Sequence, residues 1–188
     1  MSSRKKKPQP TPEFSSREPT PLPLSFYDRP TLTVARELLG KNLIVNNGTQ
    51  WRSLQINEVE AYDGLKDKAC HAHCGRTKRS EVLFGPPGHW YVYLCYGIHW
   101  LANLVTGPVN YPAAVLLRGA HEYDGPGKLT KGVGMTGAIN RLPVTPKCGF
   151  FVADGPRIPR TRVKRTPRIG IDYAGPVWSQ KPYRFLLT

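Results

Sequence analysis

Two strand-like segments joined by a very short connection constrain the fold of this chain most. Residues 89–96 and 98–105 are rich in aromatic and branched side chains, which favour β-strands, and they meet at Tyr96-Gly97. A connection this short joins antiparallel neighbours, because parallel strands need a long crossover. We therefore predict a β-hairpin that protrudes with Tyr96 at its tip.

The remaining pattern predicts an α+β fold. Apolar residues recur at helical spacing between Pro30, which suits a first helical turn, and Gly40, which suits a helix end. Short helices are expected within residues 127–139, whereas residues 63–80 look irregular. Further strands are predicted at residues 43–45, 54–62, 113–118 and 182–187, with a turn at Asn46-Asn47-Gly48 joining the first two. Strands linked by short turns indicate one compact domain with a mainly antiparallel sheet.

Residues 1–24 differ in composition from the rest of the chain. The run Arg4-Lys5-Lys6-Lys7 is followed by scattered Pro, Ser and Thr, with too few apolar side chains to offset the entropy lost on ordering. We predict a disordered tail over residues 1–24 and a folded domain over residues 25–188. No apolar run reaches the roughly 18 residues of a membrane-spanning helix, and no apolar segment follows the charged N-terminus, so neither a membrane helix nor a secretory signal is expected.

The net charge favours a polyanionic partner. Twenty-seven Lys and Arg against thirteen Asp and Glu give a formal net charge of +14 and a pI near 9.9. Residues 156–168 are basic and contain no acidic side chain. Nucleic acid is the first interpretation. An anionic membrane surface, or charge that serves solubility alone, are the alternatives.

A carboxylate needs a reason to lie in so basic a chain. Glu60 ends a predicted strand in which Glu58, Glu60 and Tyr62 share one face. An exposed acidic strand end is the simple explanation. On a surface that binds nucleic acid, however, a carboxylate would repel phosphate, so general-base catalysis is the functional explanation.

A series of aromatic rings follows Glu60 in the sequence: Tyr62, His71, Trp90, Tyr91, Tyr93, Tyr96 and Trp100. Core packing on a sheet explains any one of them. Tyr96 is different, because a large ring at a hairpin tip packs poorly into a core and can wedge between base pairs. Tyr91 and Tyr93 share one strand face and can stack on a base or line a pocket.

The segment Cys70-His71-Ala72-His73-Cys74 suggests a metal site, which we disfavour. Structural zinc sites usually draw ligand pairs from separated segments, and the sequence shows no second pair. The four cysteines are expected to be free thiols, since nothing marks the chain as secreted. Gly125-Pro126-Gly127-Lys128 lacks the spacing of a P-loop.

Eleven stretches in order carry a resemblance: Arg36-Glu37-Leu38-Leu39-Gly40, Glu58-Val59-Glu60-Ala61-Tyr62, His71, Gly75-Arg76-Thr77, Tyr91-Val92-Tyr93 with Tyr96-Gly97, Asn103, Val115-Leu116-Leu117-Arg118, Gly125-Pro126-Gly127-Lys128-Leu129, Arg168-Ile169-Gly170 and Lys181-Pro182-Tyr183-Arg184-Phe185. From about Phe26 to its C-terminus, the chain resembles the alkyladenine (3-methyladenine) DNA glycosylases without a helix-hairpin-helix. The resemblance implies a curved antiparallel sheet and an enzyme without metal or organic cofactor. It also implies that a damaged purine is flipped out of duplex DNA, since its glycosidic bond is inaccessible inside the helix.

The resemblance also assigns roles to residues. Glu60 would deprotonate a water held partly by Arg118, and that water would attack the sugar C1′ and leave an abasic site. The flipped base would lie between Tyr62 and His71 on one side and Tyr93 on the other, with Asn103 against its edge to disfavour guanine. The residues expected to contact DNA are Tyr96, Tyr91, Arg76, Lys128 and Arg168. Arg118 is expected to lower the pKa of Glu60 and keep it ionised.

The chain departs from the family pattern in two respects, and two alternative functions are left open. Cys70 and His73 flank His71 and are not expected from the family pattern, and the segment between Glu122 and Gly125 is shorter than in mammalian members. A non-catalytic nucleic-acid-binding module would explain the charge and the rings equally well, and a metal-binding regulator built on Cys70–Cys74 is a further alternative. The leading hypothesis is a monomeric, monofunctional glycosylase of double-stranded DNA, either in a bacterial cytoplasm with the nucleoid or in a nucleus.

Overall fold

The computed structural model describes residues 19–46, 48 and 50–188 of the chain. Most of the predicted tail, and Asn47 of the predicted turn, lie outside these residues. The folded part begins before residue 25, because the Leu22 amide donates to the Val152 carbonyl over 2.8 Å. Within the described residues, no helix is long and apolar enough to cross a membrane.

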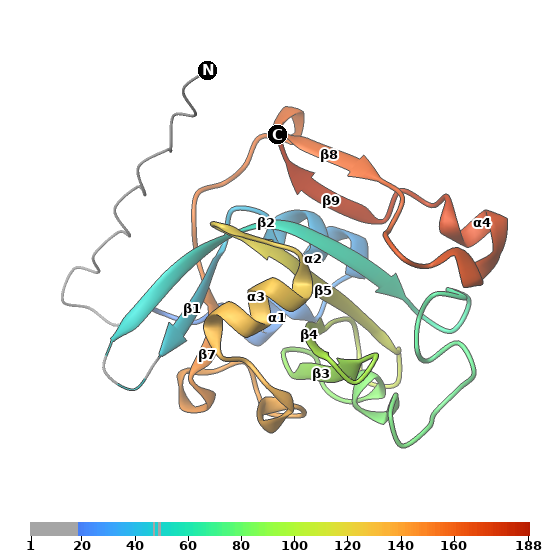
Figure 1. The fold of residues 1–188 in the computed structure, drawn as a ribbon, viewed down its shortest axis with the longest axis horizontal. Helices are drawn as coiled ribbons and strands as arrows, with labels where there is room; N and C mark the ends of the chain where they lie inside the picture. Colours follow the sequence, from blue (N-terminus) through green and yellow to red (C-terminus); the bar gives the residue numbers. More distant parts are fainter. Residues whose placement is uncertain (1–18, 47, 49) are drawn as a thin grey trace.

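The described residues form nine strands that join into one antiparallel sheet (Figure 1). The strands are β1 (Asn42–Asn46), β2 (Trp51–Asp63), β3 (Trp90–Cys95), β4 (His99–Val105), β5 (Ala113–Ala120), β6 (Tyr123–Asp124), β7 (Phe150–Ala153), β8 (Val163–Thr166) and β9 (Arg184–Leu187). The main path runs β3-β4-β5-β2-β1-β7, with β6 on β5, β9 on β2, and β8 on β9. The predicted α+β class and its antiparallel sheet are confirmed.

Helices are few and short. They are α1 (Leu24–Tyr27), α2 (Thr31–Leu38), α3 (Pro126–Val133) and α4 (Gly175–Ser179), with 3₁₀ turns η1 (Glu81–Phe84), η2 (Gly137–Ile139), η3 (Pro146–Cys148), η4 (Arg160–Arg162) and η5 (Asp172–Ala174). Helix α2 buries Val34, Ala35 and Leu38 against β2, and α3 packs on β4 and β5, in front of the sheet in Figure 1. Gly40 follows α2 with φ of 85°, so the predicted helix end is confirmed.

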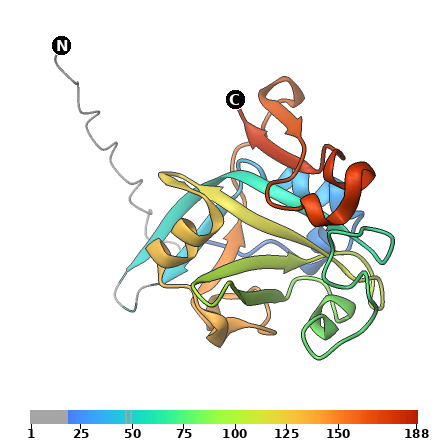
Figure 2. The ribbon, with the colours of Figure 1, turned by 45° about the vertical axis from the view of Figure 1, so that its right-hand side comes forward.

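Strand β2 organises the sheet because it changes partners along its length. Its first half pairs with β1, with Asn42 opposite Gln55. Its second half lies between β5 and β9, where Glu60 is opposite Leu116 on one side and Arg184 on the other. The strand arches across the molecule in both ribbon views (Figure 2). The residues predicted to carry chemistry therefore lie in a central strand, not at an exposed strand end.

The β3–β4 hairpin has the predicted place and a three-residue tip. Cys95 pairs with His99, and the tip residues Tyr96 and Gly97 have φ of 50° and 70°. Tyr96 is 92% exposed. A positive φ costs little in glycine but disfavours tyrosine, so this ring is presented to solvent by a backbone that its own residue does not prefer.

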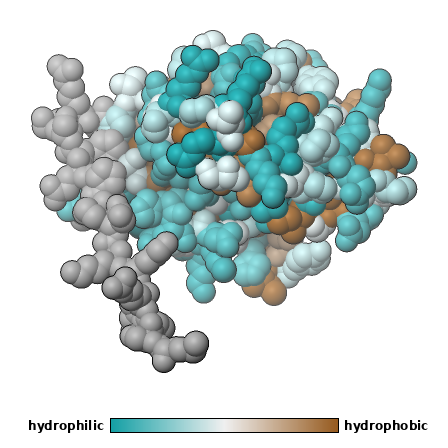
Figure 3. Space-filling view, turned by 90° about the horizontal axis from the view of Figure 1, so that it is seen from above, coloured by the Kyte–Doolittle hydropathy of each residue, from teal (hydrophilic) through white to brown (hydrophobic). Residues whose placement is uncertain are grey.

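Strands β6, β7 and β8 and helices α1 and α4 were not predicted from the sequence. Strand β8 lies in the basic, proline-rich segment, and its residues alternate too little in hydropathy to indicate a strand. It pairs only with β9, and Lys164 and Arg165 on it protect an exposed sheet edge from further pairing. The face above these C-terminal strands is mostly hydrophilic, with separated hydrophobic patches (Figure 3).

After β7 the chain crosses the corner between α2 and β1 at Gly155, which lies against Gly40. A Cβ on Gly155 would lie 2.2 Å from the Gly40 carbonyl oxygen, which is impossible without a backbone shift. Asp154 contacts Lys41 at 2.5 Å, and its backbone carbonyl accepts a hydrogen bond from Asn42 Nδ2.

We predict that Gly155→Ala lowers the free energy of unfolding by about 1–3 kcal/mol, the usual cost of overpacking. Denaturant unfolding of the purified variant measures it. Gly134→Asn is the control, because Gly134 has a φ of 70°, open space around its Cβ position, and asparagine tolerates this conformation. If Gly155→Ala were as stable as the control, the segment at Gly155 could shift away from Gly40 without loss of unfolding free energy, and the prediction would be wrong.

Candidate active site

Glu60 lies at the centre of a hydrogen-bonded group and has no solvent exposure. Its Oε2 accepts from the Tyr62 hydroxyl over 3.0 Å, and its Oε1 accepts from the Ile169 amide over 2.8 Å. Arg118 Nη1 is 3.4 Å from Oε1. Neighbouring strands and the C-terminal segment therefore fix the direction of this carboxylate.

Arg118 is shared between two carboxylates. Its Nε donates to Glu58 Oε1 over 2.7 Å, a closer contact than its ion pair with Glu60. Arg184 on β9 also donates to Glu58 Oε1, over 2.6 Å. Glu58 and Arg184 were not predicted as site residues. The signal was present, since Glu58 shares a strand face with Glu60, but its partner Arg184 lies 126 positions away.

Arg118 lowers the pKa of Glu60 as predicted, but the net shift is upward. Burial raises the pKa of Glu60, and this effect exceeds the lowering by Arg118, by the Ile169 amide and by Tyr62. Glu58 has the opposite balance, because its two arginines hold its pKa below the ordinary value despite partial burial. Glu60 is thus the stronger base of the pair.

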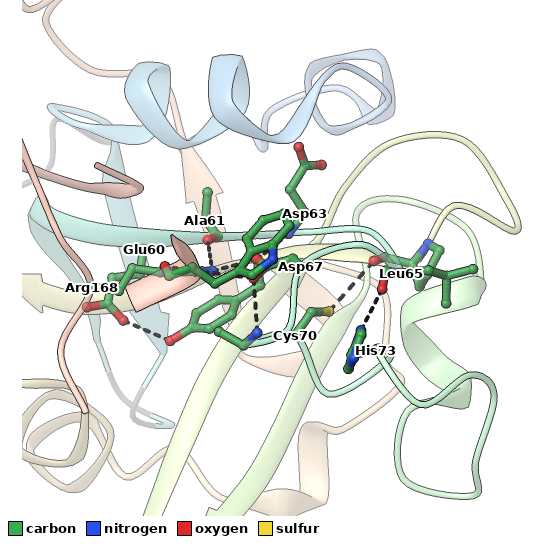
Figure 4. Close-up of polar contacts among 12 residues, drawn as sticks. Glu60, Ala61, Asp63, Leu65, Asp67, Cys70, His73 and Arg168 are labelled. Atoms are coloured by element: carbon green, nitrogen blue, oxygen red, sulfur yellow. Dashed lines mark hydrogen bonds and ion pairs between the residues drawn. The ribbon is translucent and has the colours of Figure 1, made fainter. Parts of the chain in front are cut away.

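A buried ion pair lies beside Glu60 (Figure 4). Arg168 Nη1 and Nη2 donate to the two Asp67 oxygens over 2.6 and 2.8 Å, and both side chains are fully buried. Asp67 also accepts from the amides of Asp63 and Ala69, and Arg168 also donates to the Ala61 carbonyl. Arg168 was predicted to contact DNA. The structure instead places it in the interior, where its charge is neutralised by Asp67.

The rings predicted to hold a base converge on one cavity of about 40 Å³. It is lined by Tyr62, Ala69, Cys70, His71, Leu83, Tyr91, Tyr93, Asn103, Ala114 and Tyr173. We call this cavity the aromatic pocket. Tyr62 belongs both to its wall and to the hydrogen bonds of Glu60, so the pocket and the carboxylate are adjacent.

The pocket is too small for a purine in this structure. Its volume of about 40 Å³ is far below the roughly 300–1,000 Å³ of ordinary ligand pockets. The rings of His71 and Tyr93 are 4.6 Å apart and meet edge to face. A flat base stacked between these two rings requires them to be roughly two stacking distances apart. One of the pocket walls must therefore move before a base can enter.

His71 is held in the pocket as a neutral ring. Its Nδ1 lies 2.7 Å from the Tyr91 hydroxyl. Burial, helped by the nearby Arg79 guanidinium, lowers the pKa of His71 to about 4. Neutral imidazole beside the tyrosines leaves the pocket without a positive charge from this side chain near pH 7.

Tyr91 and Asn103 form the inner wall. Each is 3% exposed, and Asn103 Nδ2 donates to the Tyr91 carbonyl over 3.0 Å. The structure thus places Tyr91, predicted to contact DNA, inside the pocket and behind Tyr93.

Three of the predicted DNA contacts lie on the surface, outside the pocket. Tyr96 projects from the hairpin tip. Arg76 donates to Asn110 Oδ1 over 2.9 Å and lies over the Phe84 ring. Lys128 is exposed on α3, next to Gly127, whose Cβ position lies 2.9 Å from His99 of the hairpin.

The side chains of the Cys70–Cys74 segment point to separate partners. His71 contacts Tyr91, His73 contacts the Leu65 carbonyl, Cys70 is buried near the Pro112 carbonyl, and Cys74 is exposed. Across residues 19–46, 48 and 50–188, no group of three or more His, Cys, Asp and Glu is arranged to hold a metal ion.

Comparison with known proteins gives a consistent result. The family model described as "Methylpurine-DNA glycosylase (MPG)" matches residues 25–124 and 120–188. A Myxococcus xanthus protein is 48% identical over 87% of this chain and 88% of its own length. Proteins of Methanocella arvoryzae and Rickettsia peacockii are 45% and 40% identical, over 87% and 89% of this chain and 90% of each relative. All three are named "Putative 3-methyladenine DNA glycosylase".

We predict that Asp67→Asn lowers the free energy of unfolding by about 3–5 kcal/mol, because it leaves the Arg168 charge unpaired in the interior. Asp154→Asn is the matched control. Its side chain is 79% exposed, against 16% for its partner Lys41, so the Asp154 carboxylate stays solvated and the pair should be worth less than about 1 kcal/mol. Denaturant unfolding compares the two, and equal losses would contradict the supporting role of the buried pair.

Proposed function

This chain belongs to the methylpurine-DNA glycosylase family, and on that premise we propose how it acts on its substrate. Members of this kind are hydrolases of N-glycosyl bonds in DNA. We infer that this protein removes alkylated or deaminated purines from duplex DNA and leaves an abasic site. The observation that carries the proposal is Glu60, a buried carboxylate of raised pKa beside a pocket of aromatic rings.

Glu60 would act as the general base. A water molecule beside it would give its proton to the carboxylate while its oxygen attacks the sugar C1′. The C1′–N bond breaks and its electron pair leaves with the base. The sugar passes through an oxocarbenium-like state, which the negative carboxylate also stabilises. General-base assistance of this kind is worth roughly 10²–10⁴-fold. Arg118, held by Glu58, would fix the water from the other side.

The aromatic pocket would select the base. An alkylated purine carries a positive charge, and the faces of Tyr62 and Tyr93 would attract it by about 0.5–2 kcal/mol. A neutral His71 adds ring contact without repulsion. A neutral lesion such as hypoxanthine would gain less from these rings and would need a proton to leave. Asn103, fixed by its bond to the Tyr91 carbonyl, would leave no room for the extra amino group of guanine.

The hairpin would hold the duplex open. Tyr96 is 92% exposed at the tip and has the size to fill the space that an extruded nucleotide leaves. Arg76 and Lys128 would contact the flanking phosphates. Contacts between one protein molecule and one lesion suffice for this geometry, so we infer a monomer that acts wherever the chromosome lies, in a bacterial cytoplasm or a nucleus.

We predict that Glu60→Gln abolishes base release, with a loss of at least about 10²-fold, while binding to DNA is retained. The assay uses duplex DNA with a single 1,N6-ethenoadenine or hypoxanthine, followed by alkali to cleave abasic sites. Glu81→Gln is the control, because Glu81 is an exposed carboxylate paired with Arg141 on the surface. Tight binding with no release by the wild type would favour a non-catalytic binding module.

We predict that the rate falls as the pH falls through a value above 4.5, the ordinary pKa of a glutamate, because burial raises the pKa of Glu60 and protonation removes the base. In Glu58→Gln, Arg118 loses its nearer carboxylate and turns to Glu60, which lowers the pKa of Glu60. The fall in rate at acid pH should therefore occur at a lower pH. Single-turnover rates measured against pH on one lesion test both statements. An acid limb at or below 4.5 in the wild type would contradict the first.

A further inference from the structure

Tyr173 is the outer wall of the aromatic pocket. It lies on η5 and is 70% exposed, whereas the pocket residues Cys70, Tyr91 and Asn103 are at most 4% exposed. Among the residues that line the pocket, Tyr173 is the one that is exposed to solvent.

One hydrogen bond connects Tyr173 to Ala69, another residue that lines the pocket. The Tyr173 hydroxyl donates to the Ala69 carbonyl over 3.2 Å. Ala69 precedes His71 by two residues and packs against Ile171 and Ala174. The bond therefore joins the C-terminal segment to the loop that carries His71.

Tyr173 makes fewer stabilising contacts than His71 and Tyr62, which also line the pocket. His71 lies 2.7 Å from the Tyr91 hydroxyl, and Tyr62 is bonded to Glu60 and covered by the Arg168 guanidinium at 4.7 Å. Tyr173 has a single long hydrogen bond to a backbone carbonyl, which an exposed ring can exchange for water at little cost. Of these three side chains, Tyr173 would lose the fewest interactions if it moved.

We propose that Tyr173 is the gate of the aromatic pocket and a determinant of its specificity. Its hydroxyl leaves the Ala69 carbonyl, the ring swings outward to admit a flipped base, and it then returns against the outer edge of that base. The size of base that fits depends on how far this ring can return. The specificity role rests on the proposed function, whereas the gating role does not.

Cys70 reports gate opening without any catalysis. It is 4% exposed and lines the pocket, so a reagent reaches its thiol when the pocket opens. In a protein carrying Cys74→Ser, Cys95→Ser and Cys148→Ser, the reaction of Cys70 with methyl methanethiosulfonate should be about fivefold faster after Tyr173→Phe, as expected for the loss of one hydrogen bond. Tyr173→Ala should be faster still.

Tyr123→Phe is the matched control for labelling. Its hydroxyl also donates to a backbone carbonyl, that of Gly132 over 3.4 Å, but it lies on β6 and not in the pocket. Labelling should be unchanged in this variant. If Tyr173→Ala labels Cys70 no faster than the control, while its unfolding curve matches that of the control, the gate is overturned.

Base selectivity tests the second part. Tyr173→Ala should shift the ratio of kcat/KM for 1,N6-ethenoadenine over hypoxanthine towards the bulkier base by about tenfold. An equal loss on both bases would make Tyr173 a contact to the DNA strand and overturn its role in specificity. If the wild type releases neither base, the proposed function and the specificity role fail together, and Cys70 labelling still decides whether the gate exists.

Discussion

The buried pair of Asp67 and Arg168 is the interaction on which the site depends. It joins the irregular loop after β2 to the segment that follows β8, and through the Ala61 carbonyl it joins both to the central strand. His71 belongs to that loop, and the Ile169 amide that fixes Glu60 directly follows Arg168. Two segments without regular secondary structure thereby gain the rigidity that catalytic geometry requires.

Near this pair, Glu58 and Glu60 have different electrostatic surroundings. Glu58 takes the closest contacts of both Arg118 and Arg184, and its pKa falls. Glu60 keeps a longer ion pair and full burial, and its pKa rises. Two glutamates on one strand face therefore differ in basicity because of their surroundings, a division of roles common in sites that combine carboxylates.

The sequence predicted the elements whose pattern is local. The hairpin around Tyr96-Gly97, the helix ending at Gly40 and the arched strand with Glu60 follow from spacing and turn residues, and the structure contains all of them. Strand β8 was missed because its order comes from pairing with β9, and a short charged edge strand has no pattern of its own. The interior place of Arg168 and the raised pKa of Glu60 were missed for a related reason. Both depend on burial, which is set by residues distant in sequence.

The strand pairing of β9 has a consequence for how the protein is made. Glu58 meets Arg184 across 126 positions, and β9 lies directly beside Glu60. A ribosome releases these residues long after β2, and contacts so distant in sequence form late in folding. A nascent chain that has emerged only as far as β5 therefore holds Glu58 and Glu60 with Arg118 but without Arg184, and their surroundings are complete only when residues near 184 have emerged. A newly made chain therefore carries most of its positive charge before its site for hydrolysis of the glycosidic bond is complete.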